Sequence, residues 1–227
     1  MKKLVKMRWI LIAILFVSVL GIPQKVDAAP KKISAVKAYA SFLKKNPSRY
    51  KEMGNDFYDA SFAPEDTSYL DSFFLYDMDK NGVPELFTIT YVNMRWEIIR
   101  IYTYQNKKVK LCKFSNGTDA VFNNSHTANG SFNFYICKKG HIHNQYIGGM
   151  SKQEVVYKVS KKKLKLLLTY EEVYVIDSIT ATKNGKRISA ERYNHCIKDC
   201  TAKKLKLYRN DLRSQNKLKK NKCKAIK

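Results

Sequence analysis

The chain has 227 residues, of which 43 are Lys or Arg and 19 are Asp or Glu, so its formal net charge is +24. This length fits one domain with a genuine hydrophobic core. Lysine outnumbers arginine by 35 to 8, whereas specific recognition of bases and phosphates favours the forked guanidinium of arginine. The composition therefore argues against a specific nucleic-acid partner and favours weak, electrostatic association with polyanions.

Residues 1–28 have the three parts of a secretory signal peptide. A cationic start is followed by an apolar run over residues 9–20 and by a small-residue site at Val26-Asp27-Ala28. The run is shorter than the roughly 18 residues expected of a membrane span. We expect cleavage after Ala28 and a secreted chain, with an uncleaved membrane anchor as the alternative.

The composition also indicates a host and a partner. Abundant Lys, Asn, Ile and Tyr, together with the Lys-rich leader, are typical of an AT-rich genome and favour a Gram-positive bacterium. A secreted basic chain there meets anionic wall polymers and lipid head groups. We expect localisation outside the cell, in association with the wall or the membrane surface.

An amphipathic helix is predicted directly after the leader. Ile33, Val36, Ala40 and Leu43 recur at helical spacing, and Pro47 ends the run. Residues 47–70 then read as an aromatic-rich connector that lies on a sheet.

Strands dominate the middle of the chain, where turn signals such as Asn81-Gly82 and Asn106-Lys107 make successive strands antiparallel neighbours. The polar stretch 115–130 is predicted to be the longest loop and a candidate contact surface. Ser189 is a plausible N-cap for a helix from Ala190 to about Leu205. The predicted strands are 72–76, 84–92, 96–104, 108–114, 131–137, 141–147, 154–160, 164–170 and 173–180.

These elements predict an α+β fold, namely a mainly antiparallel β meander with an N-terminal amphipathic helix and a C-terminal helix. Residues 29–202 form the single domain. Residues 203–227 carry eleven Lys or Arg against one Asp, a pattern typical of a solvated basic tail. Such a tail is a candidate electrostatic tether, because each basic residue near an anionic surface contributes about 1 kcal/mol.

The most specific motif is the loop DMDKNGVPEL at residues 77–86. Asp77, Asp79, Asn81 and Glu85 occupy positions 1, 3, 5 and 9 of the loop, around the turn at Gly82, and such oxygen ligands can converge on one hard cation. Val83 would add its backbone carbonyl. Position 12 of the loop is Thr88 rather than an acidic residue, so the motif is not an EF-hand.

A strand, a DxDxNGxxE loop and a second strand resemble the calcium hairpin of FG-GAP and VCBS repeats in secreted proteins. The resemblance covers about a dozen residues, and the motif occurs once in the chain. In that family the acidic positions bind Ca²⁺. The resemblance therefore implies a calcium site, with ligands at Asp77, Asp79, Asn81, Val83 and Glu85. The chain also resembles small uncharacterised secreted proteins of Gram-positive bacteria that carry one such loop.

Two other interpretations of this loop stay open. Asn-Gly is a hairpin turn in its own right, with acids that are merely solvated. An apolar strand followed by DxDx also resembles the haloacid-dehalogenase phosphatases, although Asn81 stands where that motif has Thr or Val. That family has a parallel sheet with helices between its strands.

The five cysteines predict at least one unpaired thiol in an oxidising compartment. We expect Cys112 to pair with Cys137, because they lie on neighbouring predicted strands. Cys196 and Cys200 share a predicted helix, and either could reach Cys223.

No recognised catalytic signature occurs in the chain, such as GxSxG, HExxH or GxxxxGK[ST]. His141 and His143 share one face of a strand, an arrangement that could ligate a metal, but no third ligand is identifiable and solvent exposure is the expected state. We therefore expect a secreted, non-catalytic, calcium-stabilised module held at the cell surface by charge. The alternative is a cell-wall-directed hydrolase without a recognisable motif.

Overall fold

The computed structural model describes residues 28–52, 68–93, 96–128, 130–137, 140–160, 162–198, 200, 202 and 205–225. The predicted leader lies outside these residues except for Ala28, at which the first described helix begins. Most of the predicted aromatic connector, residues 53–67, also lies outside them. Within the described ranges no helix combines the length and the apolar character needed to cross a membrane.

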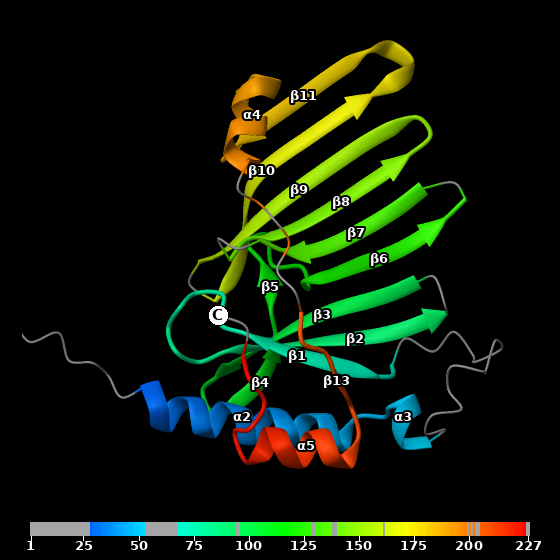
Figure 1. The fold of residues 1–227 in the computed structure, drawn as a ribbon. Helices are drawn as coiled ribbons and strands as arrows, with labels where there is room; N and C mark the ends of the chain where they lie inside the picture. Colours follow the sequence, from blue (N-terminus) through cyan, green and yellow to red (C-terminus); the bar gives the residue numbers. More distant parts are fainter. Residues whose placement is uncertain are drawn as a thin grey trace, which may run out of the picture.

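One long, twisted sheet forms the body of the molecule (Figure 1). Its strands follow the order β12-β11-β10-β9-β8-β7-β6-β3-β2-β1-β13, while β4 pairs with β3 and β5 pairs with β10. The strands are β1 (Ser72–Tyr76), β2 (Glu85–Asn93), β3 (Trp96–Gln105), β4 (Lys108–Leu111), β5 (Lys113–Phe114), β6 (Val121–Thr127), β7 (Gly130–Ile136), β8 (Ile142–Gly148), β9 (Ser151–Ser160), β10 (Lys163–Val173), β11 (Ser178–Lys183), β12 (Lys186–Ile188) and β13 (Tyr208–Arg209).

The helices cover the two ends of this sheet. Helices α2 (Ala28–Lys45), α3 (Arg49–Glu52) and α5 (Leu212–Lys219) lie at the end that carries β1 and β13, and α4 (Ala190–Ile197) lies at the β10–β11 end (Figure 1). The predicted α+β fold with an antiparallel meander is therefore confirmed. Among the strands that the structure describes, one pair is parallel, β5 with β10, and it joins strands far apart in the sequence.

Three segments of the sheet differ from the sequence prediction. The stretch 115–130 is not one long loop, because β6 lies within it and pairs with both β3 and β7. Its asparagines disfavour a strand, but Phe122 pairs with Ile99 and is buried, so tertiary packing overrides local propensity. The predicted strand 108–114 divides into β4 and β5. The predicted strand 173–180 is interrupted by a 3-10 turn, Tyr174–Ile176, and by Asp177 at φ 46°.

Helix α2 packs its apolar face against one side of β1 and β2. Val36, Ala40 and Leu43 are buried there as the helical spacing predicts, whereas Ile33 is 43% exposed. All five residues of β1 are buried. Alternate β1 residues face two cores, so that Phe73 packs towards α2 and Phe74 belongs to the other cluster.

The basic C-terminal segment is partly folded onto the domain, which differs from the predicted solvated tail. Strand β13 pairs with β1 at the edge of the sheet. Asp211 caps α5 by accepting a hydrogen bond from the Ser214 N–H at 2.6 Å, and Leu218 is fully buried beside α2. The segment is attached by sparse apolar residues, since Leu218 is a buried member of the cluster formed with α2 and β1 and Tyr208 packs against that cluster.

The disulfide pairing also differs from the prediction. Cys137, just after β7, bonds to Cys200, with their Cα atoms 4.8 Å apart. Cys112 lies between β4 and β5 as a buried free thiol, and Cys223 is likewise free and buried against α5. The predicted Cys112–Cys137 pair fails because β8 and the chain after α4, rather than the β4–β5 segment, pair with the end of β7 and with Cys137.

Helix α4 begins where the sequence predicts and ends earlier. The Arg192 N–H donates to the Ser189 hydroxyl at 3.2 Å, which confirms the predicted N-cap. The helix stops at Ile197 rather than near Leu205, and Tyr193 is its buried residue. The early stop directs the chain back to the sheet, where Ala202 bridges to Cys137.

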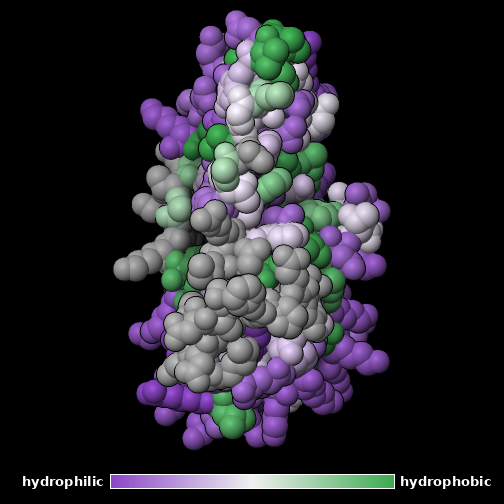
Figure 2. All heavy atoms as spheres, turned by 90° about the vertical axis from the view of Figure 1, so that its right-hand side faces the viewer, coloured by the Kyte–Doolittle hydropathy of each residue, from purple (hydrophilic) through white to green (hydrophobic). Residues whose placement is uncertain are grey.

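In the parts of the hairpin side that Figure 2 colours, hydrophilic residues surround several separate hydrophobic areas. The most exposed large hydrophobic side chains of the described ranges come from two turns: Met150 at 71%, Val175 at 74% and Ile176 at 69%. These residues project from the β8–β9 and β10–β11 turns.

Candidate metal site

The predicted calcium motif forms the hairpin loop between β1 and β2. Strand β1 ends at Tyr76 and β2 begins at Glu85, and these two residues are paired across the hairpin. The predicted strand, loop and strand arrangement is therefore present. Because β1 and β2 are adjacent and antiparallel, the loop does not have the setting of a haloacid-dehalogenase nucleophile, which lies on a parallel sheet.

Side-chain oxygens of the loop hold its tight backbone turn. Asp77 accepts hydrogen bonds from the Asn81 N–H at 3.1 Å and from the Gly82 N–H at 2.8 Å. The side-chain oxygen of Asn81, Oδ1, accepts from the Val83 N–H at 2.7 Å. Gly82 has φ 83°, in the region where glycine costs least, so its place in the motif has a backbone reason.

Three carboxylates converge on one point inside this turn. One oxygen each of Asp77, Asp79 and Glu85 lies within 4.8 Å of the other two. Glu85 is only 5% exposed, and its Oε2 accepts a hydrogen bond from the Met78 N–H at 2.9 Å. Asp79 is exposed and Asp77 half-buried, so the cluster opens from a buried carboxylate towards solvent.

The other two predicted ligands lie beside these carboxylates. The side-chain nitrogen of Asn81, Nδ2, donates to Asp79 Oδ2 at 2.7 Å. Its side-chain oxygen, Oδ1, keeps one lone pair after accepting from the Val83 N–H. Val83 is buried and lines a small hollow beside Glu85. All five predicted residues are thus neighbours in space.

The electrostatics of the loop favour a cation. Burial of the Glu85 carboxyl raises its pKa to about 8, and the charges of Asp79 and Asp77 act in the same direction. Burial also raises the pKa of Asp79, with Asp77 adding to the effect. Among the described residues no Lys or Arg forms an ion pair with Glu85. A bound cation would therefore neutralise charges that the protein itself leaves unbalanced.

Two lysines limit how strongly a cation can bind. The hollow beside Glu85 has a volume of about 10 Å³, and Lys31 and Lys162 also line it. This is close to the smallest volume that holds one water molecule. Ammonium groups near a cation oppose its binding, so the site suits a weakly held ion with a partly hydrated shell.

A second group of potential metal ligands surrounds His143, for which the sequence alone offered no third ligand. His143, predicted to be exposed, is only 1% exposed and lies beside the Cys137–Cys200 disulfide. Its partner Glu154 comes from β9, the next strand of the sheet. The signal that the sequence offered was a carboxylate beside the apolar residues of the predicted strand 154–160. In the folded sheet this carboxylate, Glu154, lies diagonally across from His143, which is paired with Val156.

Comparisons with known proteins give this chain no relative. No family model matches it, and neither a curated protein nor a solved structure is detectably similar. The function must therefore be argued from the chain's own residues.

Proposed function

We propose that this protein is a secreted, non-catalytic module whose β1–β2 loop binds one calcium ion, and that it associates electrostatically with anionic wall polymers or the membrane surface. The observation that carries the calcium proposal is the convergence of the Asp77, Asp79 and Glu85 oxygens within 4.8 Å. Hard oxygen donors of this kind suit Ca²⁺. The signal-like leader supports secretion, and the net charge of +24 supports surface association.

Calcium fits the donor set better than a softer ion does. The predicted ligands are carboxylate, amide and backbone oxygens, without sulfur or imidazole. A partly open loop with three carboxylates suggests a dissociation constant of about 10⁻⁴ to 10⁻³ M, as in extracellular calcium modules. An ion at ten times this constant stabilises the fold by about 1.4 kcal/mol.

Thermal unfolding with calcium and with chelator tests the site. For a chain of this size we expect a melting temperature about 3 to 6 °C higher in calcium. Asp77→Asn and Asp79→Asn keep the side-chain shape and should abolish this increment. Asp119→Asn is the matched control, because Asp119 is an exposed acid in another loop.

Titration calorimetry can supply the result that would contradict the calcium site. Equal melting temperatures in calcium and chelator, with no heat of binding up to several times 10⁻³ M, would mean that the loop is only an Asn-Gly turn. An increment that survives in both Asp77→Asn and Asp79→Asn would place the ion elsewhere.

Surface association is tested separately, on the basic helix α5. Its buried face rests on Leu218, so deleting the segment would disturb the core, whereas charge substitutions leave it intact. Binding to anionic vesicles should weaken, by about 1 kcal/mol for each basic residue removed near the surface, and salt should have the same effect. The test variant replaces three exposed lysines of this region by Gln: Lys217, Lys219 and Lys220.

The matched control removes the same charge from the other end of the sheet, with Gln at exposed Lys163, Lys165 and Lys186. Equal loss of vesicle binding in both variants would mean that total charge, rather than the C-terminal segment, holds the protein at the surface. Binding that is insensitive to salt would contradict the electrostatic proposal.

A further inference from the structure

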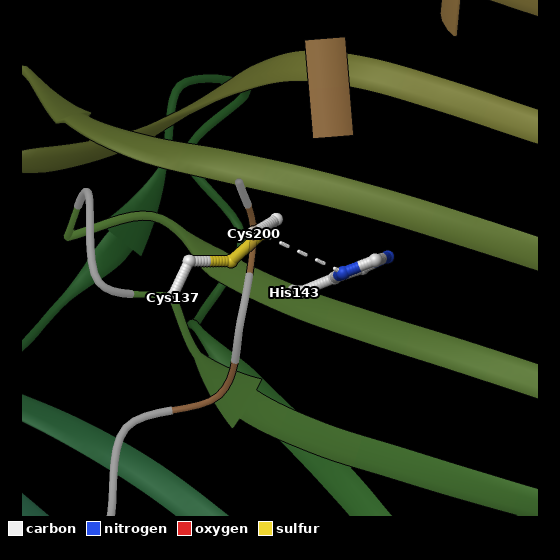
Figure 3. Close-up of side chains that lie close together, drawn as sticks. All are labelled: Cys137, His143 and Cys200. Atoms are coloured by element: carbon white, nitrogen blue, oxygen red, sulfur yellow. Dashed lines mark hydrogen bonds between the residues drawn. A yellow bond between two sulfur atoms is a disulfide. The ribbon is translucent and has the colours of Figure 1, made fainter. Parts of the chain in front are cut away.

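A sulfur and imidazole cluster lies where the chain returns from α4 to the sheet (Figure 3). Cys137 follows β7, Cys200 comes after α4, and His143 belongs to β8. The two sulfurs form the disulfide, and His143 Nδ1 lies 3.9 Å from the Cys200 sulfur. The two Sγ atoms and one imidazole nitrogen all lie within 4.8 Å of one another.

The imidazole of His143 is held by a buried carboxylate. Its Nε2 lies 3.0 Å from Glu154 Oε2, and both side chains are 2% exposed. Glu154 also accepts hydrogen bonds from Tyr193 Oη at 2.7 Å and Gln145 Nε2 at 3.0 Å, and Lys152 Nζ lies 2.5 Å from its Oε1. Burial alone would raise the pKa of Glu154, but the hydrogen bonds from His143, Lys152 and Tyr193 outweigh it and lower the pKa.

This network selects one tautomer of His143. An ionised carboxylate only accepts hydrogen bonds, so the Nε2 that faces Glu154 carries the hydrogen. In the neutral ring the lone pair is then on Nδ1, which faces the Tyr135 hydroxyl and the Cys200 sulfur. A histidine whose one nitrogen is oriented by a carboxylate, and whose other nitrogen carries the lone pair, is the usual form of a metal-binding histidine.

We propose that reduction of the Cys137–Cys200 disulfide converts this cluster into a site for a thiophilic metal ion, with Zn²⁺ as the ion that best suits two thiolates and one imidazole. A dithiol reductant supplies two electrons and two protons to the disulfide and is itself oxidised to a disulfide. Zn²⁺ then displaces the two thiol protons and binds both sulfurs and His143 Nδ1. Water or the Tyr135 oxygen completes a tetrahedral shell.

The two states exclude each other because the same sulfurs make either the disulfide or the metal bonds. Both states connect the chain after α4 to the end of β7, where Cys137 also bridges to Ala202. The metal would thus replace a covalent link with a coordinate one at the same place in the fold.

A cavity gives solvent access to the cluster. It has a volume of about 360 Å³, and the half-buried Cys200 lines it. Cys196 and His195 line the same cavity, so they are competing donors that the experiment must separate from the proposed ligands. Lys183 Nζ lies 3.5 Å from the Cys196 sulfur, and this cation disfavours a metal ion on that side.

Cobalt(II) is the spectroscopic probe, because it reports tetrahedral geometry and sulfur ligation directly. The full mature chain is reduced with a phosphine under inert gas and titrated with Co²⁺, then with Zn²⁺ in competition. We expect one equivalent to bind with thiolate-to-cobalt charge transfer, and none with that signature in the oxidised protein. Cobalt at the acidic β1–β2 loop would lack sulfur bands.

Variants assign the ligands. Cys137→Ser and His143→Gln should remove or weaken the sulfur-bound cobalt signal, whereas Cys196→Ser and His195→Gln should leave it unchanged. Glu154→Gln should lower the affinity by about 10- to 100-fold, as expected for a positioning residue behind a metal-binding histidine, and should alter the cobalt spectrum.

The proposal fails if the reduced wild type shows no tetrahedral sulfur signal, or if Cys196→Ser removes the signal as fully as Cys137→Ser. Reduction can also unfold part of the chain, and circular dichroism detects this as a loss of the native spectrum. Recovery of the native spectrum on adding Zn²⁺ supports the site, because metal affinity is then coupled to folding. Failure of Zn²⁺ to restore it overturns the proposal.

Discussion

Replacing Glu85 by Gln should stabilise the calcium-free protein at alkaline pH. Glu85 is 5% exposed, and its pKa is about 8 in the folded protein against an ordinary 4.5. Between these two pH values the folded state keeps a proton on Glu85 that the unfolded chain has lost. The folded state therefore binds more protons, and the free energy of unfolding falls as pH rises through this window.

The size of the effect follows from this pKa difference. At 1.36 kcal/mol per pKa unit, the change from 4.5 to about 8 corresponds to about 5 kcal/mol above pH 8. Water that enters the exposed side of the loop at Asp79 screens part of this electrostatic energy. We therefore expect Glu85→Gln to be more stable than the wild type by about 2 to 3 kcal/mol above pH 8. Gln keeps an oxygen that can accept from the Met78 N–H, so the substitution removes the charge without removing the hydrogen bond.

Urea unfolding in chelator from about pH 4 to about pH 9 measures this difference. Wild type and Glu85→Gln should be equally stable at the acid end and diverge as pH rises. Added calcium should recover stability in the wild type alone, because the variant lacks a ligand. Glu191→Gln is the control, since Glu191 is exposed on α4. A stability difference that does not change with pH would refute the electrostatic argument.

Two further substitutions test how the helices are attached. Leu218→Ala should destabilise the protein by about 2 to 4 kcal/mol, because Leu218 is fully buried beside α2. The control Leu212→Ala, at a side chain that is 65% exposed, should cost less than about 0.5 kcal/mol. Equal melting temperatures for the two variants would contradict the docking of α5. Arg49→Ala should lower the free energy of unfolding, measured by chemical denaturation, by about 3 to 5 kcal/mol, because it removes the buried guanidinium that lies 2.5 Å from the Asp71 carboxylate. A decrease below about 1 kcal/mol would show that water can take the place of the guanidinium.

Local chemistry determined the elements that the sequence predicts well. The turn at Gly82 has the positive φ that its residue type favours, and Asn106 likewise adopts a left-handed backbone conformation at a predicted turn. The five loop residues from Asp77 to Glu85 are neighbours in space because a hairpin brings them together over a few residues. Such features need only short-range geometry, so pattern and spacing are sufficient to predict them.

Contacts between distant segments were decided by the tertiary structure alone. The sulfurs of Cys137 and Cys200 meet across 63 residues, and no spacing rule distinguishes this pair from Cys112 with Cys137. His143 is buried because Glu154 and the chain after α4 cover it, although its own strand pattern predicts exposure. In each case the environment of a side chain is supplied by residues far along the chain, and only the folded arrangement brings those residues together.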